Sequence, residues 1–192
     1  MQRAHLFPAA LLFLASTAFS QPPDTLWTRT YAIAGYQACY DVQVTRDGGF
    51  ILAGGSELSM LLIRTAEDGD PLWIRVYSFA TYAYANSVCE LPDGGFIVAG
   101  WADGGRLMRT DSLGDTLWVC RLASAEYLYS VHCAQDGGFV ACGVATSDQS
   151  DMVVVKTDEF GAMEWARCCG GYYYDCGFEA RELADGTIMA VG

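Results

Sequence analysis

Short apolar runs alternate with glycine-containing polar turns along most of this chain, and the alternation repeats. Three runs read Phe-Ile-Leu-Ala-Gly, Phe-Ile-Val-Ala-Gly and Phe-Val-Ala-Cys-Gly, at residues 50–54, 96–100 and 139–143. Their nearly unbroken apolar character is typical of strands buried on both faces. Each run follows an Asp-Gly-Gly triplet, and Asp-Gly favours the positive φ of a tight hairpin. The pattern therefore predicts a hairpin whose second strand lies in the core.

A second hairpin follows in each copy. Its first strand contains a basic residue nine positions before a tryptophan, and the tryptophan opens the last strand four residues after a turn glycine. The basic residues are Arg64, Arg109 and Lys156, the turn glycines are Gly69, Gly114 and Gly161, and the tryptophans are Trp73, Trp118 and Trp165. An earlier member of the series, Trp27, predicts one more such strand ahead of the first complete copy.

The copies recur every 43 to 47 residues, marked by Asp47, Asp93 and Asp136, with a weaker copy at Asp185. About four short strands fit into such a unit, which is the size of one β-propeller blade. We therefore predict an all-β fold, a β-propeller with about three complete four-stranded blades and partial blades at both ends. Because the last copy stops after its second strand, the sequence favours a fragment of a larger propeller. A four-bladed ring closed by the Trp27 strand is the alternative.

The first 20 residues predict a secretory signal peptide, in which Arg3 precedes an apolar run and Ala18 and Ser20 are small residues at the cleavage point. The run covers 14 residues, fewer than the roughly 20 that a membrane-spanning helix needs. We expect one domain, a propeller repeat domain at residues 21–192 that is incomplete at its C-terminus. The expected protein is secreted, periplasmic or at the cell surface, and does not span a membrane.

Two segments resemble a known group of proteins. Residues 93–100 read Asp-Gly-Gly-Phe-Ile-Val-Ala-Gly and residues 110–118 read Thr-Asp-Ser-Leu-Gly-Asp-Thr-Leu-Trp, which resembles the propeller repeats of secreted bacterial proteins. The part from glycine to tryptophan is also similar to the tryptophan-docking repeat of PQQ-like propellers. The resemblance covers roughly residues 24–192 and implies an architecture. It selects no function, because such repeats occur in binding proteins, scaffolds and enzymes.

The formal net charge of −12 narrows the choice of partners. Such a surface repels phosphate backbones, so we expect no nucleic-acid binding. A cationic, neutral or calcium-bridged partner stays open. No cofactor is expected, although Asp148 and Asp151 in the longest loop could supply calcium ligands; a solvated acidic loop is the competing interpretation.

Loop length varies mainly on one side of the predicted propeller. The loops from the second to the third strand share that side with those from the fourth strand to the next blade. From the last glycine of the second strand to the basic residue of the third, the chain spans 10, 9 and 13 residues. Variable loops on a rigid scaffold usually carry the binding residues.

Tyrosines gather in the connections that reach this side. Aromatic rings with hydroxyl tips suit contacts with glycans or with polypeptides. The candidate ligand-binding residues are Tyr172, Tyr173, Tyr82 and Tyr127. Tyr36, Tyr82 and Tyr174 share one repeat offset, so packing between blades is the stronger alternative interpretation for these three.

The eight cysteines all follow the predicted signal peptide, and an exported chain with this many cysteines is expected to contain disulfides. Cys142 and Cys169 occupy repeat positions that are apolar elsewhere, which predicts core residues. The best local pairing is Cys168 or Cys169 with Cys176, and the candidate disulfide is Cys169 with Cys176. Metal binding by these thiols is disfavoured, because no pair has C-x-x-C spacing and no histidine is near.

Signatures of enzymes are mostly missing from the sequence, which has no G-x-S-x-G, H-E-x-x-H or Walker motif. His132 occupies a strand position filled elsewhere by Gln43, Cys89 and Arg181, which indicates a structural or surface histidine more than a catalytic base. The basic residues of the third strands either face an anionic ligand or neutralise neighbouring carboxylates, and we favour the second interpretation.

The sequence therefore predicts a binding or scaffold module without catalysis of its own, with a protein or a glycan as its ligand. The main alternative is part of a propeller enzyme, a polysaccharide hydrolase or lyase or a quinoprotein, whose site is completed by further blades. A surface structural protein that displays a downstream domain is the third interpretation.

Overall fold

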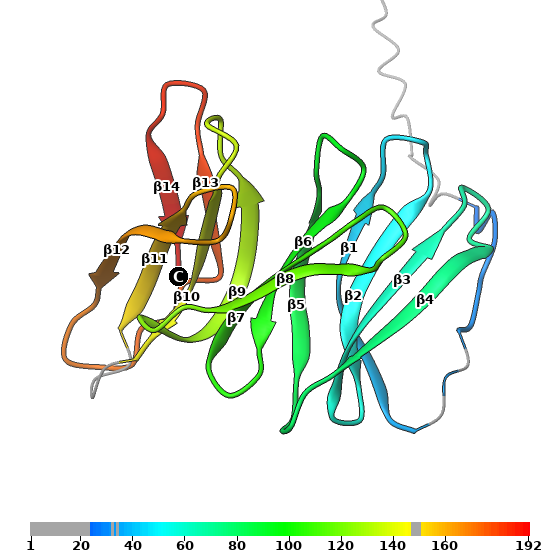
Figure 1. Cartoon of the computed structure of the whole chain (residues 1–192), viewed down its shortest axis with the longest axis horizontal. Helices are drawn as coiled ribbons and strands as arrows, with labels where there is room; N and C mark the ends of the chain where they lie inside the picture. The colour runs from blue at the N-terminus through cyan, green and yellow to red at the C-terminus, as the bar shows by residue number, and fades with distance from the viewer. Residues whose placement is uncertain (1–23, 32, 34, 147–150) are drawn as a thin grey trace, which may run out of the picture.

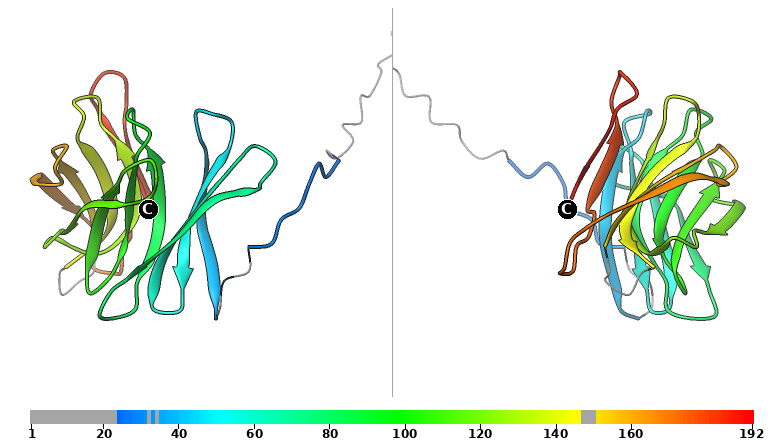
Figure 2. Two further views of the ribbon diagram at one scale, coloured as in Figure 1. Left: turned by 45° about the vertical axis from the view of Figure 1, so that its right-hand side comes forward. Right: turned by 90° about the vertical axis from the view of Figure 1, so that its left-hand side faces the viewer.

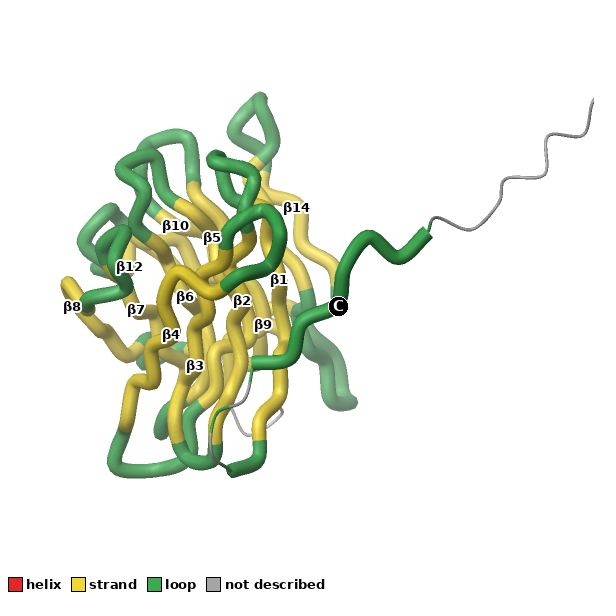
Figure 3. Tube along the Cα trace, turned by 90° about the vertical axis from the view of Figure 1, so that its right-hand side faces the viewer, coloured by secondary structure: helices red, strands yellow, loops and turns green. Residues whose placement is uncertain are grey.

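The computed structural model describes residues 24–31, 33, 35–146 and 151–192. These residues form strands and loops without a helix (Figure 3), so the predicted all-β fold is confirmed. The predicted signal peptide at residues 1–20 lies outside the described residues.

The sheets are three antiparallel four-stranded blades and one two-stranded hairpin. The first blade consists of β1 (Gln37–Val44), β2 (Phe50–Ser56), β3 (Ser59–Thr65) and β4 (Pro71–Ser78). The second consists of β5 (Tyr84–Glu90), β6 (Phe96–Trp101), β7 (Gly105–Thr110) and β8 (Thr116–Arg121). The third consists of β9 (Ala125–Cys133), β10 (Phe139–Ala145), β11 (Met152–Thr157) and β12 (Met163–Cys169). The hairpin consists of β13 (Glu179–Glu182) and β14 (Ile188–Val191).

The sheets lie side by side in chain order, with the first blade at one end and β13–β14 at the other (Figure 1; Figure 2 gives two further views). The first strand of each sheet is the innermost, and β1, β5, β9 and β13 pack consecutively against one another. Each blade follows the order predicted from the repeat, with hydrogen bonds between strands one and two, two and three, and three and four.

The strand boundaries differ from the prediction in two ways. The strands that precede the Asp-Gly-Gly turns, expected at residues 40–45, 86–91 and 129–134, start at Gln37, Tyr84 and Ala125, and the fourth strands begin two residues before their tryptophans. The strand predicted at Trp27 is wrong, because residues 24–31 have no strand structure. Trp27 nevertheless stacks edge-on against Phe50 of the first blade, with ring centroids 5.8 Å apart.

The Asp-Gly-Gly turns have the predicted geometry. Gly94 has a φ of 82°, which a residue with a side chain rarely adopts. A Cβ on the following Gly95 would clash with the backbone oxygen of Thr110 on β7. Asp93 closes the turn by accepting a hydrogen bond of 3.0 Å from the amide of Gly95. Both glycines and the aspartate are therefore required by the backbone of this hairpin.

The core lies between blades. One cluster of buried side chains joins β2 and β3 to the second blade, and a second joins the second blade to β9, β10 and β11. Phe96 and Phe139, which follow the Asp-Gly-Gly turns, are 1% exposed. The second strands β6 and β10 are buried on both faces, as predicted, while β2 is partly exposed at Phe50 and Leu52. Blades thus bury their apolar faces against each other, as the repeat requires.

Polar side chains also join each inner strand to the next. Oδ2 of Asp41 on β1 accepts a hydrogen bond of 2.9 Å from the amide of Val88 on β5. The same repeat position pairs Ser87 with Val131 at 3.3 Å and Ser130 with Ala180 at 3.1 Å. These bonds fix the register between consecutive inner strands.

Candidate functional site

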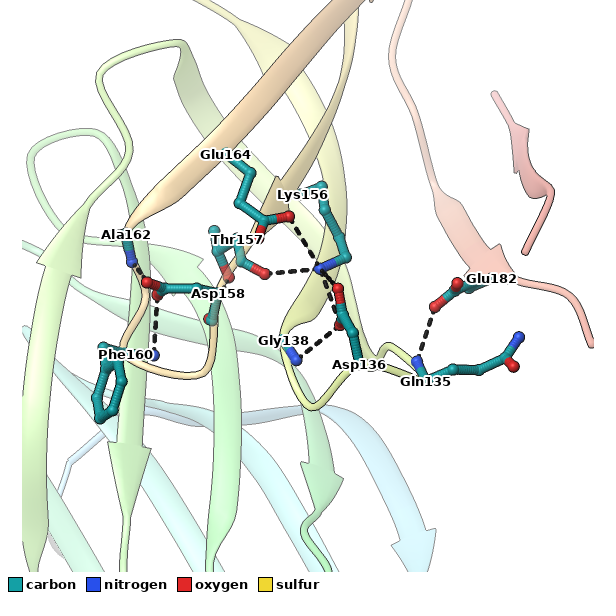
Figure 4. Close-up of polar contacts among 10 residues, drawn as sticks. All are labelled: Gln135, Asp136, Gly138, Lys156, Thr157, Asp158, Phe160, Ala162, Glu164 and Glu182. Carbon is teal, nitrogen blue, oxygen red and sulfur yellow. Dashed lines mark hydrogen bonds and ion pairs between the residues drawn. The ribbon is translucent and has the colours of Figure 1, made fainter.

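The basic residues of the third strands are paired with the turn aspartates. Lys156, 5% exposed, places Nζ 2.7 Å from Oδ2 of Asp136 and 3.2 Å from Oε2 of Glu164, and donates to the backbone oxygen of Thr157 at 2.9 Å (Figure 4). The ion pair with Lys156 lowers the pKa of Asp136. The cation therefore anchors the turn of its own blade.

Arg64 and Arg109 make the same pair with Asp47 and Asp93. Nη2 of Arg64 lies 2.5 Å from Oδ1 of Asp47. Hydrogen bonds from Arg64 lower the pKa of Asp47 to about 2. Neutralisation of neighbouring carboxylates is thus the confirmed interpretation of these cations.

Six aromatic side chains follow one another across the blades and form what we call the aromatic row. The row consists of Tyr40, Tyr84, Trp101, Tyr127, Tyr129 and Phe178. Each ring contacts the next, with centroids between 5.5 and 6.4 Å apart. Such contacts hold the rings in fixed orientations.

The aromatic row lies on the side of the variable loops. Its residues come from the first halves of β1, β5 and β9, from the end of β6, and from the residue before β13. Tyr40 and Phe178 at its two ends are 53% and 60% exposed, and the four rings between them are partly buried. Burial raises the pKa of Tyr129 to about 12, so its hydroxyl is protonated at neutral pH and remains a hydrogen-bond donor.

A polar hollow adjoins the row between the inner strands. It is lined by Tyr40, Asp41, Gln43, Asn86, Ser87, Tyr129, His132, Glu179 and Arg181. These side chains come from all four inner strands, so the hollow lies at the centre of the array. Asn86 is fixed by donating to the backbone oxygen of Leu128 at 2.8 Å. The hollow therefore offers oriented carboxylate, amide and hydroxyl groups beside aromatic rings.

The predicted binding tyrosines lie in three different regions of the structure. Tyr127 belongs to the aromatic row. Tyr172 and Tyr173, 87% and 80% exposed, contact each other edge-on at 5.5 Å and line a second pocket. Tyr82 is 60% exposed in the connection before β5. Tyr36, Tyr82 and Tyr174 are all more than half exposed, so none of them is buried between blades, although Tyr174 forms a hydrogen bond with Tyr129 of the third blade.

All eight cysteines lie among the described residues, and all are free. Cys142 is buried, as predicted, whereas Cys169 is exposed on the outermost strand of its blade, so its prediction as a core residue is wrong. Cys169 and Cys176 line the same pocket as Tyr172. A disulfide between them stays a prediction.

Asp148 lies outside the described residues, and Asp151 directly follows the gap. Within the part of the chain that the structure describes, no group of three or more histidine, cysteine or acidic side chains is arranged to hold a metal ion. The same part contains no helix that is long and apolar enough to cross a membrane.

The sequence analysis predicted only Tyr127 of the aromatic row, and it did not predict the contact between Cys89, Cys133 and His132 at the junction of the second and third blades. The repeat contains a signal for the row and for this contact. Residues at one repeat offset lie at equivalent places on neighbouring blades, and Cys89 and His132 share such an offset, as do Tyr40 and Tyr129.

Comparison with protein-family models finds no match, and comparison with curated protein sequences finds none either. Solved structures do match. A protein of unknown function from Bacteroides caccae is similar at 16% identity and a TM-score of 0.58, over 83% of this chain and 55% of that one. The WD40 β-propeller domain of Doa1 is similar at 15% identity and a TM-score of 0.58, over 80% of this chain and 47% of that one. The chain thus spans about half the length of these structures, and the likeness shows its fold, consecutive blades of a β-propeller.

Proposed function

We propose that this chain is a binding module, and that its aromatic row receives a polypeptide segment of neutral or positive charge. The observation that supports this proposal is the row itself, because six contacting rings on the side of the variable loops form a preorganised surface. Tyrosine and tryptophan bring large contact area and few rotatable bonds, and they dominate the energetics of many protein interfaces.

Charge favours a polypeptide over a neutral glycan. The chain has 23 acidic and 11 basic residues, and the polar hollow beside the row includes Asp41 and Glu179. Carboxylates next to aromatic rings suit lysine and arginine side chains, which bind both to the charge and to the ring faces. The acidic character of the chain would therefore favour a basic segment along the row, while Glu179 in the hollow is already paired with His132 and Arg181.

Selection from a displayed library of random peptides tests the proposal. We expect enrichment of sequences rich in lysine, arginine and aromatic residues, with binding that weakens as salt increases. Tyr127→Ala removes a ring from the middle of the row, so binding of the selected peptides should fall about tenfold or more. Tyr36→Ala is the matched control, because Tyr36 is 78% exposed and lies outside the row.

Equal binding by the Tyr127→Ala variant and the wild type would contradict the proposal. A parallel glycan array separates the two ligand classes. Binding to glycans that is lost in Tyr127→Ala, without enrichment of any peptide, would replace the polypeptide by a carbohydrate. Loss confined to Tyr172→Ala and Tyr173→Ala would move the site to the second pocket.

We further infer that the protein is exported and related to secreted bacterial propellers with tryptophan-docking repeats. The signal-like residues 1–20 support export. A docking geometry supports the relationship: a Cβ on Gly114 or Gly161 would meet the ring of Trp73 or Trp118 from the preceding blade. Expression of the full chain in a bacterial host, followed by N-terminal sequencing, should give an extracytoplasmic protein that starts at Gln21. Retention of Met1 in the cytoplasm would contradict export.

A further inference from the structure

Two thiols meet at the junction between the second and third blades. Sγ of Cys89 on β5 lies 3.7 Å from Sγ of Cys133 on β9. Both side chains are partly buried. The hydrogen bond from the amide of Val131 to Oγ of Ser87 holds the two strands in register two residues before each thiol. The packing of the blades therefore fixes the two sulfur atoms opposite each other.

This junction differs chemically from the other two. Between the first and second blades, the backbone amide of Arg46 donates a hydrogen bond of 2.8 Å to Glu90. Between the third blade and the β13–β14 hairpin, the amide of Gln135 donates one of 2.8 Å to Glu182. Both donors directly precede the aspartate of an Asp-Gly turn. At the middle junction the corresponding donor is Pro92, which has no N–H, and the glutamate is replaced by Cys133. A pair of thiols thus stands where the other junctions have a hydrogen bond.

The surroundings of the two thiols make them chemically unequal. The Cys133 thiol and His132 donate hydrogen bonds to Cys89 and lower the pKa of Cys89 to about 5, against the effect of burial. The same contact with Cys89, together with burial, raises the pKa of Cys133. Nε2 of His132 lies 2.7 Å from Oε1 of Glu179, and the pKa of His132 is raised, first by Cys89 and also by Glu179. These shifts favour the thiolate form at Cys89 and the thiol form at Cys133.

Arginines are the remaining charged groups that act on this cluster. Arg46 and Arg109 act on Cys133, and Arg181 acts on His132. The arginines near Cys133 favour its ionisation, but less strongly than Cys89 and burial oppose it. The neighbours of Cys89 on balance favour its ionisation, and those of Cys133 on balance oppose it.

We propose that Cys89 and Cys133 form a thiol–disulfide exchange site, which takes a protein or small-molecule disulfide as its oxidant and closes a disulfide between the two blades. Closure needs little movement. A disulfide bond measures about 2.05 Å, so each sulfur moves by less than about 1 Å from its present position.

The exchange occurs in two balanced steps. The Cys89 thiolate attacks one sulfur of the oxidant R–S–S–R′, forming Cys89–S–S–R and releasing R′–S⁻. The Cys133 thiol then loses its proton to the released thiolate and attacks Sγ of Cys89, which forms the Cys89–Cys133 bond and releases R–S⁻. The two protein thiols lose two electrons, and the oxidant gains them. His132 is a positioning residue, which stabilises the attacking thiolate.

Peptide mapping of the full chain tests the proposal. The reduced protein is equilibrated with oxidised glutathione, blocked with N-ethylmaleimide and digested with trypsin without reductant. We expect the peptide of residues 76–106 to be linked to that of residues 122–156, and the link to disappear on reduction. Because the second peptide also contains Cys142, fragment spectra must place the link on Cys133. Absence of a link, or a link to Cys142, in folded protein overturns the proposal.

Variants separate the roles of the two thiols. Cys133→Ser should accumulate a glutathione adduct on Cys89, because the resolving thiol is gone. Cys89→Ser should give neither link nor adduct on Cys133 at neutral pH. Cys120→Ser, a partly buried thiol on β8, is the matched control and should keep the link. Equal adduct formation on Cys120 and Cys89 would overturn the assignment of Cys89 as the attacking thiol.

The His132→Gln variant tests the role of His132 through the pH dependence of Cys89 alkylation, which a purely structural role would not change. In the wild type, alkylation of Cys89 should rise with a midpoint near pH 5. In the variant, the midpoint should move towards the value of about 8.5 for an ordinary thiol. An unchanged pH profile would overturn the role of His132. The wild-type peptide map remains decisive if any variant fails to fold.

Discussion

The ring of Trp73 on β4 lies against Phe96 on β6 of the next blade, with centroids 5.8 Å apart and planes inclined by 72°. Trp118 and Phe139 repeat the contact at the following junction with centroids 6.1 Å apart. The contact joins the outer strand of one blade to the buried second strand of the next. It therefore links the rim of the array to its core.

Trp73→Ala should destabilise the fold by about 3–5 kcal/mol, because it opens a cavity against Phe96 and removes a ring packed on the core. Urea unfolding followed by far-UV circular dichroism measures the loss. Leu72→Ala is the matched control, since Leu72 is 58% exposed on the same strand, and should change stability by less than about 0.5 kcal/mol. Equal losses in the two variants would contradict the docking role of Trp73.

Gly95→Ala should destabilise the second blade by about 2 kcal/mol or more, because the added Cβ meets the backbone oxygen of Thr110, which a side-chain rotation cannot move. Gly171→Ala adds the same atom where nothing lies within 4 Å, and should be nearly neutral. Thermal unfolding of both variants beside the wild type decides the matter. A Gly95→Ala variant as stable as the wild type would show that the turn accommodates the added Cβ, and would contradict this prediction.

Acid should weaken the first turn through Asp47. Its pKa in the folded chain is about 2, below the ordinary value of 3.8, so its pairing with Arg64 stabilises the fold above that ordinary value. The stabilisation is lost as the pH falls from about 4 towards 2. Asp47→Asn should lower stability at neutral pH and flatten this part of the stability profile. Glu159→Gln, at an exposed carboxylate in the turn before β12, should leave the profile unchanged.

His132 should titrate above its ordinary pKa of 6.5, because Cys89 and Glu179 favour the imidazolium. A raised pKa stabilises the fold below 6.5, and this stabilisation is lost as the pH rises through the raised value. Chemical shifts of the ring carbon give the pKa by NMR. Cys89→Ser should lower it most and Glu179→Gln less, and a pKa insensitive to Cys89→Ser would contradict the contact.

The repeat made much of the fold predictable, because its signals are local. Asp93, Gly94 and Gly95 specify a turn whatever surrounds them, and the buried strand after the turn follows from its apolar run. The tryptophan series likewise located the outer strands to within two residues. Trp27 is the exception. A strand needs a hydrogen-bonded neighbour, and among the described residues the segment around Trp27 pairs with none.

Burial at the edges of the array was less predictable. Cys169 is exposed, whereas Tyr77 and Leu122 at the same position of the first two blades are partly or fully buried; those two blades are each followed by a four-stranded blade, and β12 is followed by a two-stranded sheet. Tyr82 and Tyr174 share an offset and yet extend outward. Position within a repeat determines the strand, while exposure depends on whether another blade covers that strand.

The candidate site was predictable only in part, for a related reason. Tyr127 was among the predicted residues, whereas Tyr84 and Trp101, which stack beside it, were not. Cys89 and Cys133 are distant in sequence and differ by one position within the repeat. Their contact depends on how closely adjacent inner strands approach, and that spacing is a property of the assembled blades.

Hydrogen bonds from the amides of Val88, Val131 and Ala180 to Asp41, Ser87 and Ser130 join consecutive inner strands, so the blades lie mechanically in series. A chain pulled from its two ends gives way at one such connection at a time. Each released blade lengthens the chain by about 150 Å, the contour of one repeat. A covalent bond between Cys89 and Cys133 would make the middle connection outlast its neighbours, so oxidation would change the order in which the blades yield to force.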